Sequence, residues 1–153
     1  MEIEPIGIIH TPFKTKEECP VQPRFANSQT GKIELFEQFA LGLKDIETFS
    51  HIYLIYQFDR SGAVEMIRST FLDDIPRGLF ATRHPCRPSQ IGISIVELVK
   101  KDGCFLEVKG VDMLDKTPLL DIKPYIPKYD RIDEASEGWT ENVVWRPKPE
   151  GRE

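Results

Sequence analysis

The run at residues 49–58, FSHIYLIYQF, is the most apolar stretch of the chain and constrains its fold more than any other segment. Its length and its content of isoleucine, tyrosine and phenylalanine favour a central β-strand over a helix. Side chains of a strand alternate between its two faces. One face is therefore predicted to lie in the core, because most of the large apolar residues share one parity: Ile52, Leu54, Tyr56 and Phe58, with Phe49 at the start.

Shorter segments of strand character lie on both sides of this run. A brief helix is expected at residues 36–41, and residues 64–72 are interpreted as either a further strand or an irregular arm. An Asp-Gly pair at residues 102 and 103 predicts a hairpin. With about seven strands and no alternation of strands with helices, the chain is predicted to be all-β, a sandwich or compact barrel with one short helix. The further strands are expected at residues 2–10, 31–35, 79–82, 91–100, 104–109 and 117–125.

The length of 153 residues predicts one domain, with its core at about residues 6–127. Residues 128–153 form an acidic, irregular tail in which apolar residues are sparse. We expect this tail to wrap the surface, with Trp139 and Trp145 as anchors.

The compartment follows from what the sequence lacks. No run of about 18 apolar residues is present, so no membrane span is expected. The first ten residues lack the basic start of a secretory signal. The cysteines, Cys19, Cys86 and Cys104, form no CxxC pair or Cys/His cluster. This pattern favours a reducing cytoplasm and argues against a structural zinc site.

Positive charge is concentrated in one part of an acidic chain. The net charge is −5, yet residues 77–101 hold five cations and only one acidic residue, Glu97. A focused patch of this kind can capture an anion even on an acidic protein. We therefore expect a nucleic-acid-binding patch made of Arg77, Arg83, Arg87, Lys100 and Lys101.

Two of these arginines stand in a short loop, RHPCRP, at residues 83–88. Its two prolines each fix φ near about −65°, so the loop should be stiff. A stiff loop that presents guanidinium groups suits a carboxylate, a phosphate or a purine edge. A solvated basic turn is the plain alternative. An activated thiolate at Cys86 beside His84 is a weaker one, because adjacent loop residues rarely adopt nucleophile–base geometry.

Two further loops are candidates for ligand contact. Residues 14–30 lack strand alternation and a helical period, which predicts either a ligand-covering loop or a flexible surface excursion. Residues 110–116, GVDMLDK, hold Asp112 and Asp115. Two carboxylates suit a cation without specifying one, so a solvated turn is the alternative. The sequence lacks the usual fingerprints of nucleotide, zinc-protease and serine-hydrolase sites.

Two long motifs carry a resemblance to a known family. FATRHPCRPSQIGIS, at residues 80–94, resembles the F-x-T-R-x-x-x-R-P-N-P-I-G-x-S signature of the TsaA-like family, also called TrmO. DMLDKTPLLDIKPYIP, at residues 112–127, resembles that family's D-x-x-D-G-T-P-x-x-D-I-K-P-Y-x-P signature. Weaker matches include IGIIHTPFK near the start and the PVQP loop at residues 20–23, so the resemblance runs from about residue 6 to residue 127.

Members of this family are β-barrels that dimerise, bind S-adenosylmethionine near the subunit interface and methylate N6 of threonylcarbamoyladenosine at position 37 of a transfer RNA. The resemblance therefore implies a cytoplasmic, homodimeric methyltransferase that needs no metal and acts on the anticodon loop of tRNA. The alternatives are an S-adenosylmethionine-binding regulatory or scaffold module without methylation activity and, more weakly, a small-molecule methyltransferase. Carried over by position, the cofactor-binding residues are Pro20, Val21, Gln22, Asp59, Arg60, Arg83, Arg87, Asp112, Met113, Leu114 and Asp115.

Three positions depart from the family pattern. Ser89-Gln90 replaces Asn-Pro, Asp59 replaces a frequent histidine, and Lys116 replaces the glycine of the aspartate loop. The first two departures touch expected walls of the site. The Ser89-Gln90 departure and the negative net charge keep the alternative without methylation open. An aspartate is expected to bind the cofactor's ribose or amine, and an arginine to clamp its carboxylate or a tRNA phosphate.

Overall fold

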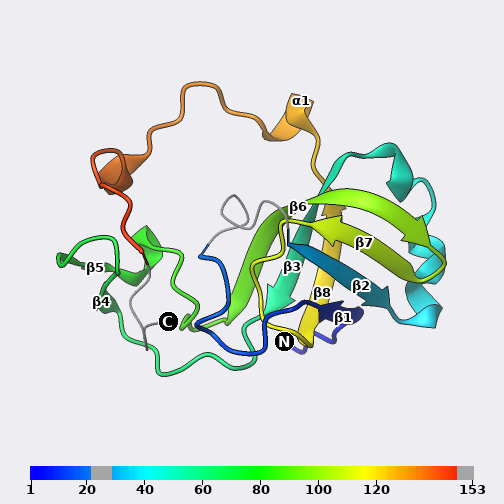
Figure 1. Ribbon diagram of the computed structural model, residues 1–153, viewed down its shortest axis with the longest axis horizontal. Coiled ribbons are helices and arrows are strands. Elements are labelled where there is room, and N and C mark those ends of the chain that lie inside the picture. The colour runs from blue at the N-terminus through cyan, green and yellow to red at the C-terminus, as the bar shows by residue number, and fades with distance from the viewer. Residues whose placement is uncertain (22–28, 148–153) are drawn as a thin grey trace.

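Six antiparallel strands close into a barrel in the order β1–β2–β7–β6–β3–β8 (Figure 1). This is a computed structural model that describes residues 1–21 and 29–147. The all-β prediction is confirmed, and of the two forms considered the chain adopts the barrel. The barrel strands are β1 (Gly7–His10), β2 (Thr30–Leu35), β3 (His51–Gln57), β6 (Ile91–Asp102), β7 (Phe105–Lys109) and β8 (Thr117–Pro124).

β3 is the central strand that its apolar sequence predicts. It pairs with β6 on one side and β8 on the other. Ile52, Leu54 and Tyr56 are buried, while the residues between them are partly exposed. Alternation along β3 therefore places one face in the core, as predicted. The other strands contribute inward-facing side chains to the same core, among them Ile9, Ile33, Val96, Leu106, Val108 and Leu119.

β6 is the longest strand and carries apolar residues on its outer face. Its even-numbered residues from Gly92 to Val96 are buried, whereas the isoleucines between them are exposed, with Ile93 at 59%. β6 joins β7 through a two-residue turn that begins at Gly103. Gly103 has a φ of 58°, a conformation that glycine adopts without steric cost. The predicted hairpin is confirmed.

A small arm follows the end of β3. It contains the two-stranded sheet of β4 (Ile67–Ser69) and β5 (Pro76–Gly78), followed by the 3-10 turn η4 (Leu79–Ala81). The strand predicted at residues 79–82 is therefore wrong. The backbone N–H and the hydroxyl of Thr82 both donate to the carbonyl of Leu79, over 3.1 and 2.8 Å. A threonine that bonds a nearby carbonyl favours a turn over an extended strand.

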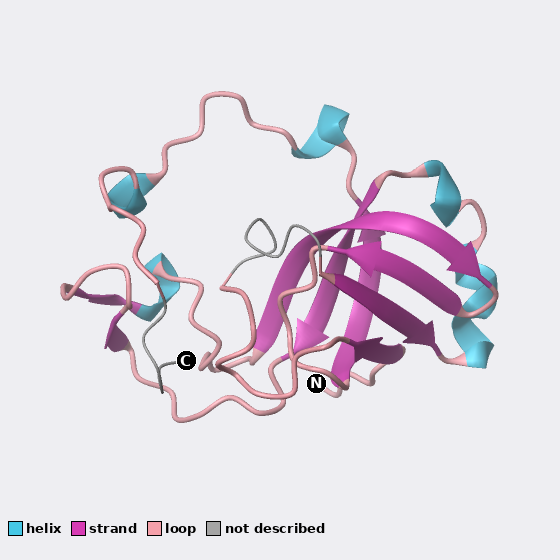
Figure 2. Ribbon diagram, in the orientation of Figure 1, coloured by secondary structure: helices cyan, strands magenta, loops and turns pink. Residues whose placement is uncertain are grey.

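In residues 1–21 and 29–147, helical structure is limited to short segments (Figure 2). The helix predicted at residues 36–41 is the 3-10 segment η2 (Glu37–Leu43), which is followed by η3 (Ile46–Thr48). In the described residues, the single α-helical turn is α1 (Pro127–Asp130), and the tail holds η5 (Gly138–Thr140). None of the helices in this part of the chain is long and apolar enough to span a membrane.

The C-terminal tail leaves the barrel after α1 and returns to the arm (Figure 1). The indole of Trp139 stacks on Arg77, whose guanidinium carbon lies 4.1 Å from the ring centroid. Its Nε1 donates to the carbonyl of Ala81 over 2.7 Å. Trp145 packs edge-on against Phe71, with ring centroids 5.7 Å apart. Both tryptophans anchor the tail as predicted, and the surface they hold is the arm.

Antiparallel pairing brings distant segments to the same end of the barrel. We name the loop end of the barrel as the end where β1, β3 and β7 finish and β2, β6 and β8 begin. There Ile9 lies opposite Thr117, and Gln57 lies opposite Ile91. The opposite end, which holds the turn between β6 and β7, is the hairpin end. Two loops lie at the loop end. They are residues 83–88, which we call the arginine loop, and residues 110–116, which we call the aspartate loop.

Candidate functional site

Three polar side chains form a chain of hydrogen bonds inside the loop end. Tyr56 of β3 and Ser94 of β6 are 3% and 4% exposed, and their hydroxyl oxygens are 3.0 Å apart. Ser94 Oγ donates to Oδ1 of Asp112 over 2.6 Å. Because the hydroxyl proton of Ser94 goes to Asp112, the hydroxyl of Tyr56 is the donor to Ser94. The hydrogen bonds thus run from the barrel core to the aspartate loop.

This environment changes the acidity of both end groups. Burial raises the pKa of the Asp112 carboxyl from 3.8 to about 7, while the hydrogen bond from Ser94 and the nearby charge of Arg83 act in the opposite direction. Burial and the charge of Asp112 raise the pKa of Tyr56, so its phenol stays protonated. A carboxyl group that titrates near neutral pH is suited to accept a proton during catalysis.

The position of the Tyr56 ring depends on Gly92. A Cβ atom at residue 92 would lie 2.3 Å from Cε2 of Tyr56, and only glycine avoids that overlap. On another side, Phe58 packs edge-on against the same ring, with centroids 5.3 Å apart. The sequence interpretation did not assign a role to Tyr56 or Ser94. The available signal was a serine on the buried parity of β6, where an apolar side chain would be expected.

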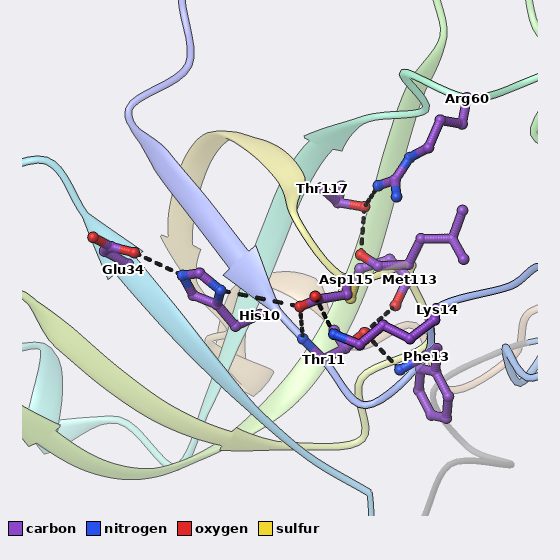
Figure 3. Close-up of polar contacts among 10 residues, drawn as sticks. His10, Thr11, Phe13, Lys14, Glu34, Arg60, Met113, Asp115 and Thr117 are labelled. Atoms are coloured by element: carbon purple, nitrogen blue, oxygen red, sulfur yellow. Dashed lines mark hydrogen bonds and ion pairs between the residues drawn. The ribbon is translucent and has the colours of Figure 1, made fainter.

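Asp115 has a different, structural role (Figure 3). Its Oδ1 accepts a 2.9 Å hydrogen bond from the backbone N–H of Thr11, and its Oδ2 pairs with Nζ of Lys14. Burial opposes ionisation, but the hydrogen bonds from Lys14 and Thr11 outweigh it and hold the pKa of Asp115 below its usual range. Asp115 therefore ties the segment after β1 to the aspartate loop. Within residues 1–21 and 29–147, no group of three or more His, Cys, Asp or Glu side chains could hold a metal.

The remaining contacts of the aspartate loop fix its backbone. The carbonyl of Met113 accepts from the hydroxyl of Thr11 over 2.9 Å, and the Met113 side chain is buried in the core. The carbonyl of Leu114 accepts from the hydroxyl of Thr117 over 2.7 Å. Arg60, just after β3, donates from Nη2 to that same hydroxyl over 3.2 Å (Figure 3). Arg60 therefore lies next to Thr117, the first residue of β8 after the aspartate loop.

The structure describes the surroundings of three further predicted cofactor residues, Pro20, Val21 and Asp59. Asp59 lies beside Arg60, with Oδ1 3.0 Å from Nε. Pro20 and Val21 are partly buried next to Cys19, which packs against the core. Gln22 lies outside the described residues. The segment after β1 is thus held against the barrel as far as residue 21.

Arg83 and Arg87, the two arginines of the arginine loop, have different surroundings and roles. Nη1 of Arg87 donates to the carbonyl of Thr82 over 2.9 Å and also lies within reach of the carbonyls of Leu79 and His84. Arg87 therefore fixes the loop. Arg83 is exposed and close enough to the aspartate loop to lower the pKa of Asp112. Arg83 is the better placed of the two to meet a ligand that enters the loop end.

The expected basic patch is not continuous. Arg77 pairs with an aspartate of the arm and stacks on Trp139. Lys100 and Lys101 lie at the hairpin end, where Nζ of Lys101 donates to the carbonyl of Leu43 over 3.0 Å. Roughly 30 Å of strand separates these lysines from the arginine loop, at about 3.3 Å per residue. The prediction of one patch is wrong because β6 carries its two basic ends to opposite ends of the barrel.

The fold and the site define a class: a closed antiparallel barrel whose loop end gathers a partly buried carboxyl group, an arginine loop and the segment that follows β1. A family model for the tRNA-methyltransferase O N-terminal domain matches residues 8–131. The chain belongs to this family, TrmO, as its motifs predict.

Relatives and solved structures agree with this assignment. A probable S-adenosyl-L-methionine-binding protein of Pyrococcus abyssi is 48% identical over 140 residues, which cover 92% of this chain and 76% of the relative. The tRNA (adenine(37)-N6)-methyltransferase of Escherichia coli is 34% identical over 152 residues, covering 93% of this chain and 65% of the relative. A crystal structure of TrmO superposes with a TM-score of 0.78 at 36% identity, covering 90% of this chain and 63% of that one. The chain thus spans somewhat less than two thirds of the length of these last two proteins.

Proposed function

We propose that the protein uses S-adenosylmethionine to methylate N6 of threonylcarbamoyladenosine at position 37 of tRNA. The observation that carries this proposal is the partly buried Asp112 carboxyl, which accepts from Ser94 at the loop end and titrates near neutral pH. The names of the Escherichia coli and human relatives support the adenine 37 N6 position. The threonylcarbamoyl group of the substrate comes from the resemblance of the motifs.

The residues at the loop end suit S-adenosylmethionine. Its amine and ribose hydroxyls need acceptors and its carboxylate needs a cation. The partly exposed carboxyl of Asp59 and the exposed guanidinium of Arg83 supply one of each. The backbone of the aspartate loop and the segment at residues 20–22 would complete the site. When bound, S-adenosylmethionine supplies an electrophilic methyl group on a sulfonium.

Asp112 would accept the proton that N6 of the adenine loses. Its carboxylate is fixed by Ser94, which Tyr56 orients in turn, so the acceptor oxygen needs little reorganisation. The target base must leave the stack of the anticodon loop to reach this position. Above pH 7 the carboxyl group is mostly ionised, so we expect kcat/KM to rise as the pH increases through this value.

A labelled methyl group tests the function directly. S-adenosylmethionine carrying a labelled methyl is incubated with tRNA whose position 37 is threonylcarbamoylated, and the nucleosides are analysed by mass. Label on N6 at that position supports the proposal, and tRNA with unmodified adenosine 37 is the comparison substrate. Asp112→Asn should reduce kcat by about 100-fold or more. The control Asp133→Asn, which changes an exposed carboxylate in the tail, should leave kcat unchanged.

A second candidate is an S-adenosylmethionine-binding regulatory or scaffold module. It is favoured by the archaeal relatives, whose names describe binding alone. The labelling assay separates the two candidates, and calorimetry in the presence of a chelator tests the expectation that both bind S-adenosylmethionine without a metal. Binding of S-adenosylmethionine without methyl transfer to any tRNA would favour the module. A tRNA substrate would agree with the expected cytoplasmic location.

We also propose that the chain forms a homodimer through the outer face of β3 and β6. Ile93 and Ile95 are exposed there, and Tyr53 lies opposite Ile95 on the neighbouring strand. A contiguous apolar strip of this kind marks an interface. Ile93→Glu should convert the dimer to a monomer in sedimentation experiments, whereas Leu41→Glu, at another exposed apolar position, should not. A parent protein sedimenting at 17.6 kDa at micromolar concentration would contradict the proposal.

A further inference from the structure

An exposed aromatic ring stands beside the arginine loop. Phe80 is the middle residue of η4, and 74% of its surface is exposed. Its neighbour Leu79 is 1% exposed. The turn therefore buries one apolar residue and presents the next to solvent, on a part of the chain that the cofactor residues do not include.

The backbone that carries this ring is fixed by side-chain hydrogen bonds. The carbonyl of Leu79 accepts from the hydroxyl of Thr82 over 2.8 Å. The carbonyl of Ala81 accepts from Nε1 of Trp139 over 2.7 Å, and that of Thr82 accepts from Arg87 over 2.9 Å. Three anchored carbonyls within four residues leave the turn little freedom. A ring held in one place loses little conformational entropy when a ligand packs against it.

The ring forms one wall of a pocket. The pocket measures about 280 Å³ and is lined by Phe80, Arg87, Pro88, Ser89 and Ile91. The guanidinium carbon of Arg87 lies 5.6 Å from the centroid of Phe80. An aromatic face next to an arginine plane is a combination on which nucleobases stack, and Pro88, which also lines the pocket, has a fixed φ.

We propose that this pocket is a stacking site for an unpaired nucleobase of an RNA substrate. The inference rests on the proposed function, because it requires RNA as the partner. The arginine adds positive charge that favours a polyanion, on a protein whose net charge is −5. A second splayed base held here would orient the RNA loop while the target base enters the loop end.

Strand geometry separates this pocket from the site inside the barrel. Ile91 faces outward from β6, whereas Ser94, three residues further along, faces inward and bonds Asp112. Successive side chains of a strand point to opposite faces. The pocket therefore opens on the outer side of the first residues of β6. Of the residues carried over as cofactor-binding, Arg87 lines it, whereas Asp59 and Arg60 do not.

The test uses an RNA stem-loop with the fluorescent base 2-aminopurine placed at each loop position in turn. Stacking on Phe80 should quench one of these positions on binding to the parent protein. Phe80→Ala should remove that quenching and weaken RNA binding about 5- to 100-fold, the loss expected for one stacked base. Phe80→Trp, which keeps an aromatic ring at this position, should retain the quenching and the RNA affinity of the parent. Leu41→Ala, at an exposed apolar position in η2, is the matched control and should behave like the parent.

Calorimetry with S-adenosylmethionine distinguishes the source of the base. Unchanged cofactor affinity in Phe80→Ala, together with weaker RNA binding, supports the proposal. An equal loss of cofactor affinity would overturn it and assign the pocket to the adenine of the cofactor. Unchanged RNA binding in Phe80→Ala, or no RNA binding by the parent, would also overturn it. If Phe80→Ala loses RNA while neither protein methylates position 37, the pocket stands and the proposed function fails.

Discussion

Asp112 and Asp115 lie three residues apart on one loop, yet their surroundings shift their pKa values in opposite directions. Burial raises the pKa of Asp112 to about 7, against a hydrogen bond from Ser94. Asp115 is buried and Asp112 only partly so, but contacts with Lys14 and Thr11 hold the pKa of Asp115 below the usual range. The first carboxyl therefore destabilises the folded state when it is ionised, and the second stabilises it.

Asp112→Asn should stabilise the protein at alkaline pH. The folded protein holds the Asp112 proton up to about pH 7, while the unfolded chain loses it near pH 3.8. Stability of the parent therefore falls as the pH rises from about 4 to 7. The variant lacks this fall, so its advantage in unfolding free energy grows across that window to at most about 4 kcal/mol. Urea unfolding at a series of pH values measures it, and a variant less stable than the parent at pH 8 would contradict the assignment.

Asp115→Asn should have the opposite effect. The lowered pKa of Asp115 means that its ionised form stabilises the folded state above about pH 4, and this contribution is lost as the pH falls through the folded pKa. The variant should lose about 1–3 kcal/mol at pH 7, because the contacts with Lys14 and Thr11 weaken. Thermal unfolding at pH 7 and pH 3 checks this. A penalty that did not shrink at pH 3 would show that the charge of Asp115 is unimportant.

Gly92→Ala should disturb the Tyr56–Ser94 contact. The new Cβ would lie 2.3 Å from the Tyr56 ring and force it to move, which we expect to destabilise the protein by about 1–3 kcal/mol. Gly78→Ala is the matched control, because a Cβ there meets nothing within 4 Å and Gly78 has a φ of −60°. The control should change stability by less than about 0.5 kcal/mol. Equal effects of the two substitutions would exclude the packing explanation.

The sequence predicted those parts of the fold that local pattern determines. Alternation in β3 identified the central strand and its buried face, and the Asp-Gly pair identified the hairpin that turns at Gly103. The turn at Leu79 was mistaken for a strand. Thr82 and Arg87 donate hydrogen bonds to it from within the same loop, and Trp139 donates a third from the C-terminal tail. No local pattern encodes the contact with Trp139.

The candidate site was predictable at the level of loops but not of individual roles. The family motifs selected the arginine and aspartate loops, and the structure places both at the loop end. Asp112 and Asp115 could not be told apart, since their difference comes from Ser94 on one side and Lys14 on the other. The prediction of one continuous basic patch was wrong for a related reason. Arg87 and Lys100 are close in sequence, but β6 lies between them. Because an extended strand rises about 3.3 Å per residue, the two residues are far apart in space.

Arg83 and Lys100 lie at opposite ends of the barrel, and this leads to two competing predictions about where RNA binds. If the target base enters the loop end, Arg83 lies near its phosphates and Lys100 lies at the far end of β6. Each phosphate contact on a single-stranded loop contributes about 0.7 to the slope of log K against log salt. Arg83→Gln should therefore weaken tRNA binding and flatten that slope by about 0.7, while Lys100→Gln leaves both unchanged. Binding measured from low to moderate salt, with thermal unfolding to verify that both variants fold, decides between the two ends. A flattened slope in Lys100→Gln alone would move the RNA-binding face to the hairpin end.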